Sequence, residues 1–384
     1  KVIDFFRKYG VVFIALIPII LSIYVRMLAG YLPITDDWAA NSVINGITSQ
    51  IKSSIDQQYP NLPDANKNAL VDTELQKVLT QNKAQIYHQI KATSQYFKAF
   101  FQDENGNNYM PDIDPYYWYR YAKNIVDHGH PGDILKEGRP ISGGGYVKEK
   151  TPFDTYKLAP VGRFVHADVF HVYFLAYFYK FLHFFARNLT LMRSMFYVPV
   201  FISALCVLLV FLVTRKFAGN IGGFFAALIM AVNAAFLGRT LFGHADNDGW
   251  VVLFPLVITW LFITTINIKN NIKSAILIVF AGYFTGLYTT AWSGWWHIFD
   301  FILATIAITL IYLVLVGVRG MKGNIKLWLH DLSIRHIVIV GILYLLSTLL
   351  FTTLFLGFAE FRNSFLGPFS FKSIKEPVTP YIWP

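Results

Sequence analysis

The sequence predicts an all-α polytopic membrane protein with a large helical first external loop. Hydrophobic residues make up 55% of the 384 positions. Seven apolar runs are each long enough to cross a hydrocarbon core, which takes about 20 helical residues. Basic residues recur in alternate loops between these runs, and one long polar segment follows the first run. The runs are therefore expected to cross the membrane in alternating directions.

The basic charge balance and the single cysteine narrow the class of protein further. The net charge of +10 is interpreted as anchoring of cytoplasmic loops, so membrane lipid is an expected partner and nucleic acid is not. Cys206 lies inside an apolar run, which leaves neither a disulfide framework nor a thiolate metal site.

Four segments follow one another along the chain. Residues 1–32 hold the first span, after a basic N-terminus expected in the cytoplasm. Residues 33–190 form the external loop, residues 191–358 the remaining spans, and residues 359–384 a final external loop. The predicted spans are 11–32, 195–213, 221–237, 251–268, 275–290, 298–318 and 337–358.

The external loop contains two segments of helical character. In residues 64–102, apolar residues recur near helical spacing, between Pro63 and an Asn/Gly-rich stretch that ends the pattern. This predicts one long and one shorter helix. We expect these helices to carry no catalytic residues. Residues 167–187 are strongly aromatic but also carry Asp168 and Lys180. We expect this second segment to lie in the membrane interface, because crossing would place Arg215 and neighbouring basic residues outside.

A pair of carboxylates lies where a span begins, within the motif at residues 239–250. Asp246 and Asp248 are two residues apart, and Arg239 precedes Asp246 by seven residues. Carboxylates are costly near membrane depth and usually serve ions, substrates or pairing there. Arg239 is expected to bind the same oxygens or to orient Asp248.

Two further acidic positions are expected on the same face of the membrane. Asp114 lies in an Asp-Ile-Asp-Pro motif of the external loop, and Glu376 lies in the final loop. Carboxylates converging from three loops suit a hard divalent cation, Mn²⁺ or Mg²⁺, because no thiolate is available. A hard cation beside a bilayer suits a lipid-linked phosphate or pyrophosphate.

Three ordered motifs resemble those of oligosaccharyltransferase catalytic subunits. The run from Arg239 to Gly249 is similar to the second acidic motif of the family, with the same arginine spacing. The run from Asp112 to Arg120 resembles the first-loop motif, in which the aspartate before proline is a metal ligand, and Ser373-Ile374-Lys375-Glu376 resembles the fifth-loop motif. The helical insertion resembles the archaeal, AglB-type branch.

The resemblance implies a GT-C transmembrane domain and a metal-dependent, inverting transfer of an oligosaccharide from a dolichol-(pyro)phosphate carrier to asparagine in Asn-x-Ser/Thr. The matching family positions imply that the cation is surrounded by Asp114, Asp246, Asp248 and Glu376. Asp114 and Glu376 also hold the acceptor amide, and Arg239 acts beside them. The implied partners are the lipid-linked donor and the acceptor protein. The implied location is the external face of an archaeal plasma membrane.

The sequence departs from the family pattern in two respects. The chain has no initiator Met and ends at Pro384, so we take it for a fragment without the C-terminal domain whose Trp-Trp-Asp motif reads the acceptor. Trp295 and Trp296 are not that motif; they belong to an aromatic belt or to a groove facing the lipid substrate, and we count them as expected substrate contacts. Seven spans precede Glu376 where the family has nine, so a helix pair is absent or lies uncounted between Val318 and Arg335.

Two alternatives stay open at this point. Another GT-C glycosyltransferase using a polyprenyl-phosphate sugar would act on a lipid or glycan and would not need the Glu376 motif. A cation transporter would use Asp246 and Asp248 as its ion site, but it predicts acids near the bilayer midplane and internal repeats, and the sequence has neither.

Overall fold

A computed structural model describes residues 2–140, 146–165, 169–268, 271–321 and 332–365 of the chain. The chain divides into two compact units, Met27–Pro111 and a second unit that joins Lys1–Arg26 to Asp112–Pro384. The two units are described separately. The predicted external loop, residues 33–190, thus contributes to both.

The smaller unit is a three-helix element. Its members are a 3₁₀ turn and three α-helices: η1 (Leu28–Tyr31), α2 (Ile34–Gln58), α3 (Asp64–Gln81) and α4 (Lys83–Ala99). A small apolar core holds them together, formed by Ala39, Val43, Ile55, Val71 and Ile86. The hydroxyls of Thr35 and Ser94 also join α2 to α4, at 3.2 Å.

The prediction of one long and one shorter helix in residues 64–102 was wrong in detail. Helices α3 and α4 are of similar length, 18 and 17 residues, and they meet at Asn82. Asn82 has φ −107° and ψ 25°, outside the helical region, so the chain turns there. A polar Gln-Asn-Lys run supplies no apolar contact that would keep one helix continuous across this point.

In the described part of the chain, six helical segments are long and apolar enough to cross a membrane. This agrees with the predicted polytopic membrane protein. The segments are Gly10–Tyr31, Leu191–Val232, Asp248–Ile266, Asn271–Thr289, Trp296–Val316 and Leu332–Leu356. They belong to α1 (Val2–Met27), α8 (Val198–Val232), α10 (Asp248–Ile266), α11 (Asn271–Thr289), α12 (Trp296–Met321) and α14 (Leu332–Leu356).

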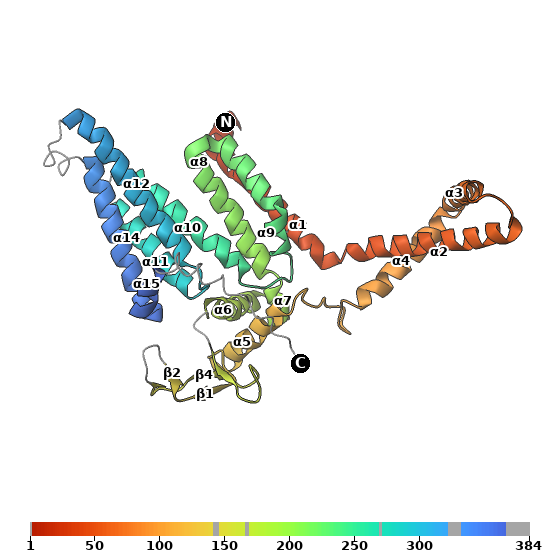
Figure 1. Cartoon of the computed structure of the whole chain (residues 1–384), viewed down its shortest axis with the longest axis horizontal. Helices are drawn as coiled ribbons and strands as arrows, with labels where there is room; N and C mark the ends of the chain where they lie inside the picture. The colour runs from red at the N-terminus through yellow and green to blue at the C-terminus, as the bar shows by residue number, and fades with distance from the viewer. Residues whose placement is uncertain (1, 141–145, 166–168, 269–270, 322–331, 366–384) are drawn as a thin grey trace. The chain divides into compact units, whose positions relative to one another are not determined.

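Helix α8 is a hairpin of two arms, so the seven predicted spans and the six segments agree. The segment from Leu191 to Val232 has 42 residues, about 63 Å of helix and twice a hydrocarbon core. Gly219 breaks it with φ 66° and ψ −169°, and Figure 1 shows the two arms side by side. A Cβ on Gly223 would lie 3.0 Å from the Phe211 carbonyl oxygen, so the arms are in close contact.

The remaining spans pack through small residues as well. A Cβ on Gly282 of α11 would lie 1.9 Å from Ser347 Oγ of α14, and one on Gly286 would lie 2.5 Å from Phe351 Cβ. Glycine is therefore required at both positions for α11 and α14 to approach each other. The stretch between Val318 and Arg335, where an uncounted helix pair was one of two alternatives, lies mainly outside the described part of the chain.

A small β region that was not predicted follows helix α5 (Asp114–His128) in the otherwise helical fold. Strands β1 (Ile134–Lys136), β4 (Thr151–Asp154) and β5 (Arg163–Phe164) form an antiparallel sheet in the order β1-β4-β5. Strands β2 (Arg139–Pro140) and β3 (Tyr146–Val147) form a second pair. Each strand has two to four residues, too few for an alternating pattern to be visible in the sequence.

The β region is held to α5 by a charged cluster around Asp154. The carboxylate of Asp154 is buried and accepts hydrogen bonds from both terminal nitrogens of Arg120 and from the Tyr121 hydroxyl. Burial disfavours the charged carboxylate, but these hydrogen bonds outweigh it and lower the pKa of Asp154 to about 2. Arg120 also pairs with Asp133, at 3.0 Å.

We expect Asp154→Asn to loosen the β region, because it leaves the Arg120 guanidinium without its buried partner. In the parent protein this stabilisation is complete above about pH 4, the unfolded pKa of an aspartate, and is lost as pH falls through about 2. Pepsin cleavage of residues 133–165 should therefore accelerate from pH 4 to pH 2 in the parent and already be fast at pH 4 in Asp154→Asn. Equal cleavage of the two proteins at pH 4 would contradict this assignment.

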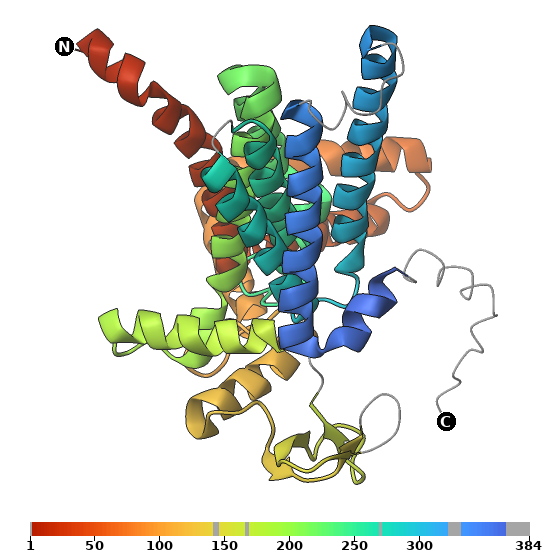
Figure 2. The same cartoon turned by 90° about the vertical axis from the view of Figure 1, so that its left-hand side faces the viewer.

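Helix α6 (Phe170–Phe185) lies across one end of the bundle, as Figure 2 shows. That α6 lies in the membrane interface stays a prediction. Its 16 residues extend about 24 Å, short of a hydrocarbon core. His171, Val172, Leu175 and Ala176 are buried against the protein, whereas Tyr177, Phe181, Phe184 and Phe185 are exposed. We call this end of the bundle, where α5 and the strands also lie, the α6 end.

The alternating spans predict which loops share a face. The α8 hairpin turns at the end opposite to α6, so Lys216 at the turn and Ser293 in the loop after α11 face opposite sides. In a Cys206→Ala background, Asn188→Cys and Ser293→Cys should react with an impermeant maleimide added outside intact cells. Lys216→Cys and Asn271→Cys should react only after permeabilisation. Reaction of Lys216→Cys from outside with protection of Ser293→Cys would mean that α6 crosses the membrane.

Candidate metal centre

The candidate site is built on the loop between α9 (Ala234–Gly238) and α10. The Arg26 side chain, wholly buried, holds the start of this loop through hydrogen bonds to Thr240 Oγ1 and the Ala231 carbonyl, both at 2.9 Å. Gly243 adopts φ 93°, and a Cβ there would lie 2.5 Å from the Phe196 ring. Glycine is therefore required at Gly243 for the loop to turn against α7 (Leu191–Met195) and the residues after it.

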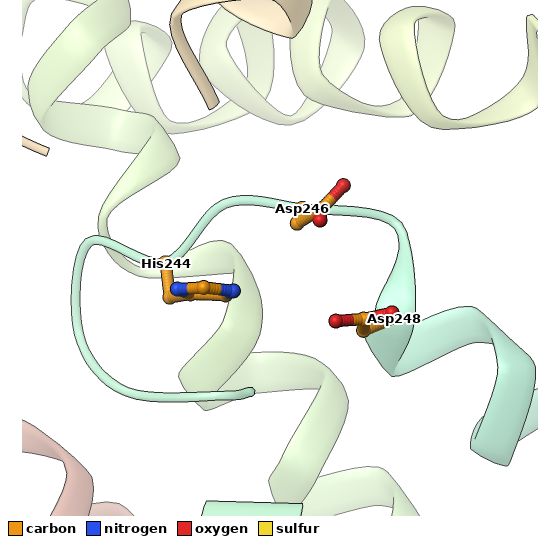
Figure 3. A group of neighbouring side chains, drawn as sticks. All are labelled: His244, Asp246 and Asp248. Atoms are coloured by element: carbon orange, nitrogen blue, oxygen red, sulfur yellow. The ribbon is translucent and has the colours of Figure 1, made fainter. Parts of the chain in front are cut away.

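Three potential ligand side chains converge at the end of this loop. His244, Asp246 and Asp248 each offer one ligand atom, and these atoms lie within 4.8 Å of one another. Figure 3 shows the imidazole and the Asp248 carboxylate approaching from opposite ends of the loop, with Asp246 between them. Asp248 is the first residue of α10, where the positive end of the helix dipole favours a carboxylate.

The polar atoms of this cluster fit a bound cation. His244 Nε2 and Asp248 Oδ2 are both buried and have no hydrogen-bond partner among the residues that the structure describes. Buried polar atoms are rarely left without one, and a cation between them would satisfy both. Asp246 Oδ1 accepts hydrogen bonds from the Trp118 indole and the Asn247 amide, at 2.8 and 2.7 Å, which leaves Oδ2 as its remaining ligand atom.

The structure brings together most, not all, of the predicted site residues. Asp114 is the exposed first residue of α5, and its carboxylate interacts electrostatically with that of Asp248. Arg239 forms an ion pair with Asp248, with Nη1 to Oδ2 at 3.6 Å, while its side chain remains 64% exposed. Glu376 lies outside the described residues.

His244 is the ligand candidate that sequence reasoning missed. The signal for it was present, because His244, Asp246 and Asp248 occupy alternate positions of one short loop. The loop is not an extended strand, because the Ala245 and Asp246 amides donate to the carbonyl oxygens of Gly243 and His244, two residues earlier. The sequence does not specify that conformation, so the histidine was not distinguished from its neighbours.

Trp295 does not fit its predicted role as a substrate contact. Its side chain is completely buried, and its indole nitrogen donates a hydrogen bond to Glu360 Oε1, at 3.0 Å. Trp295 therefore fixes helix α15 (Phe358–Ser364) against the start of α12. Trp296 is half-buried, and its role as a substrate contact stays a prediction.

Two aromatic side chains, His171 and Trp250, support the metal-ligand loop from behind through hydrogen bonds. His171 of α6 contacts the loop through Nε2, which lies 3.1 Å from the Ala245 carbonyl oxygen. Trp250 Nε1 donates to His171 Nδ1, at 2.9 Å, so the proton of the neutral imidazole is on Nε2 and is donated to Ala245. Complete burial lowers the pKa of His171 to about 4, which keeps the ring neutral near pH 7. The tautomer is thus fixed from both sides.

Replacing His171 should weaken metal binding although His171 is not a ligand. We expect His171→Leu to reduce Mn²⁺ affinity by about 10- to 100-fold, the usual effect of losing an outer-shell hydrogen bond. Trp250→Phe, which removes only the donor to His171, should have a smaller effect in the same direction. His183→Leu, on the same helix but bonded to the Leu189 carbonyl, is the control. Calorimetric Mn²⁺ titration would contradict this role if His171→Leu matched the control.

Comparison with known proteins identifies similar sequences over most of the chain. Residues 83–378 match the family model described as oligosaccharyl transferase STT3, N-terminal. A dolichyl-phosphooligosaccharide-protein glycotransferase of Methanococcus voltae is 26% identical over 321 residues, covering 79% of this chain and 33% of that protein. Its counterpart in Methanocaldococcus jannaschii is 29% identical over 249 residues, covering 60% and 26%. The chain thus spans a third or less of these curated relatives.

A solved structure is also similar. The archaeal oligosaccharyltransferase AglB from Archaeoglobus fulgidus, in complex with an inhibitory peptide and a dolichol-phosphate, is 17% identical with a TM-score of 0.47. The similarity covers 70% of this chain and 30% of that chain.

Proposed function

The chain belongs to the oligosaccharyl transferase STT3 family, and from this premise we propose that it carries the metal centre of a protein glycosyltransferase. The enzyme moves an oligosaccharide from a dolichol-linked phosphate or pyrophosphate to asparagine in an Asn-x-Ser/Thr sequon. The observation that carries the proposal is the cluster of His244, Asp246 and Asp248 at the end of a membrane-helix bundle. The names of the curated relatives support the donor and the reaction.

The ligand set supports a divalent cation, and Mn²⁺ fits it better than Mg²⁺. His244 supplies an imidazole nitrogen, whereas Asp246 and Asp248 supply oxygen atoms, and Asp114 and Glu376 are proposed to complete the site. Carboxylates suit Mg²⁺ and Mn²⁺ equally, but imidazole has a higher affinity for transition metals. A bound cation supplies Lewis-acid stabilisation of charge on the phosphate leaving group, worth several kcal/mol.

The protein side chains around the cluster have separate proposed tasks. Arg239, exposed and within 3.6 Å of Asp248, orients this carboxylate and offers its free guanidinium nitrogens to the phosphate oxygens. Asp114 is exposed at the first residue of α5, where its carboxylate accepts hydrogen bonds from the acceptor amide. Glu376 shares this task and brings the acceptor nitrogen to the anomeric carbon of the sugar.

The distribution of basic residues supports a site on the external face of a cell membrane. Arg215 and Lys216 lie at the turn of the α8 hairpin, at the opposite end from the metal-ligand loop, and Lys273 begins α11 on the same side. Basic loops favour the cytoplasmic side. The archaeal relatives make an archaeal plasma membrane the proposed location.

Transfer to a sequon peptide tests the proposed function. The full-length protein, in detergent with Mn²⁺, receives a dolichyl-phosphate-linked oligosaccharide and a fluorescent peptide containing Asn-x-Thr. We expect a glycopeptide from this peptide and none from the matched Gln-x-Thr peptide, because glutamine places its amide one methylene too far from the donor. Transfer to a lipid or a free glycan, with none to the peptide, would instead favour the second kind of GT-C enzyme.

A further inference from the structure

A cavity of about 230 Å³ has Trp118 in its wall, the residue that contacts Asp246 of the candidate metal centre. Helix α5 lines it with Tyr117, Trp118 and Tyr121, and Lys157, Arg163 and Phe164 line it from the β region. The Trp118 indole also donates to Asp246, at 2.8 Å. A ligand in this cavity is therefore one side chain away from a candidate metal ligand.

The cavity carries positive charge that no carboxylate balances. Lys157 Nζ donates to the Tyr117 hydroxyl, at 3.0 Å, and lies 4.8 Å from the centre of that ring. Arg163 is exposed. In the part of the chain that the structure describes, neither cation has a carboxylate within ion-pair distance. Two unmatched cations in one cavity favour an anionic ligand.

The nearest carboxylate is already committed to other partners. Asp154 lies opposite Arg163 in the β4–β5 ladder, but its side chain accepts hydrogen bonds from Arg120 and Tyr121. Asp133, a second acid of this region, pairs with Arg120 and accepts from the Thr155 amide and hydroxyl. Among the described residues, Lys157 and Arg163 therefore neutralise no acid.

The aromatic walls narrow the ligand class further. A pyranose has an apolar C–H face that packs on an aromatic ring and a rim of hydroxyls that pairs with polar groups. Tyr117, Trp118 and Tyr121 provide rings on one side of the cavity, and pockets of this kind combine aromatic walls with a few polar groups that fix orientation. Arg163 would bind a carboxylate through two parallel hydrogen bonds.

We propose that this cavity is a subsite for an acidic saccharide unit, a pyranose that bears a carboxylate. The assignment of that unit to the glycan of the lipid-linked donor rests on the proposed function. In that case the donor phosphate lies at the metal centre, and a sugar of the same molecule reaches the cavity past Trp118. The two cations then select donors whose glycan contains an acidic sugar.

Direct binding tests the subsite without any transfer reaction. The purified protein in detergent, with EDTA present, is titrated with methyl glucuronide and with methyl glucoside by saturation-transfer NMR. We expect the glucuronide to bind at least about tenfold more tightly, and Lys157→Gln combined with Arg163→Gln to abolish that difference. The control is Lys123→Gln, which removes an exposed lysine of helix α5. Lys123 pairs with Asp127, so this variant should keep the preference for the glucuronide.

Three results would overturn the assignment. They are equal binding of the two glycosides, a preference that survives in the double variant, and displacement of the glucuronide by inorganic phosphate at equal concentration. The last result would identify a phosphate site, such as one for a lipid headgroup. Mn²⁺ titration of the double variant should give the parent affinity, which shows that the variant is folded.

Kinetics then connects the subsite to the donor. With dolichyl-phosphate disaccharides that end in glucuronic acid or glucose, the double variant should lose about tenfold in kcat/KM for the acidic donor and little for the neutral one. A failure of transfer in the parent protein would remove the proposed function but would leave the glycoside titration standing. The two proposals are therefore separately testable.

Discussion

Asp246→Asn is expected to reduce glycopeptide formation by at least about 100-fold, the scale of losing one positioned electrostatic element in an active site. The substitution keeps the size of the side chain and its hydrogen bond from Trp118, so the loop should keep its conformation. It removes the negative charge and the anionic oxygen that would bind the cation. Addition of EDTA to the parent protein should reduce activity to the same extent, and Mn²⁺ should restore it.

The matched control for this prediction is Asp112→Asn. Asp112 belongs to the first acidic motif, but its side chain accepts a hydrogen bond from the Ile113 amide and is not a candidate ligand. We expect this variant to keep near-parent activity, whereas Asp114→Asn should lose as much as Asp246→Asn. Glu376→Gln should behave like Asp114→Asn. Near-parent transfer by Asp246→Asn would remove the metal-centre interpretation.

His244→Leu is expected to change which metal the protein prefers as well as how tightly it binds. The imidazole is the one nitrogen ligand in the candidate set among the described residues, and nitrogen ligands raise affinity for Mn²⁺ more than for Mg²⁺. We expect Mn²⁺ affinity to fall by about 100-fold and Mg²⁺ affinity by less, because a buried ligand is lost in both cases but only the transition metal loses its preferred donor.

Calorimetric titration with each metal measures this ratio directly. His297→Leu is the control, because His297 lies in the first turn of α12 and bonds to the Gly294 carbonyl oxygen. A parallel fall for Mn²⁺ and Mg²⁺ would mean that His244 supports the loop and is not a ligand. Unchanged affinity for both metals would mean that His244 does neither.

The apolar pattern determined most of the membrane architecture. Seven runs of sufficient length and the alternation of basic loops predicted the spans, and the even number of crossings between Asp114 and Asp246 predicted an interfacial helix near residues 167–187. Both predictions rest on the length of each apolar run and on the charges beside it, and these can be read from a short stretch of sequence. The structure agrees with the predicted spans, with α8 folded back at Gly219, and the interfacial position of α6 stays a prediction.

The β region and the position of the helix break at Asn82 were not predicted. Strands of two to four residues carry too little periodicity to be recognised, and their stability comes from the Arg120–Asp154 contact across 34 positions. Helix breaks without proline or glycine depend on which face of each helix is buried. Neither is encoded in a short window of sequence.

The acids at Asp246 and Asp248 were found from the sequence because charge beside a span is unusual whatever the fold. The roles of His244, Trp118, His171 and Trp295 were decided by the tertiary structure alone. Each depends on a contact between distant segments, such as Trp118 with Asp246 across 128 positions and Trp295 with Glu360 across 65. Residue type at a single position cannot distinguish an exposed aromatic that binds substrate from a buried one that fixes a helix, because that difference is made by the neighbours that folding brings together.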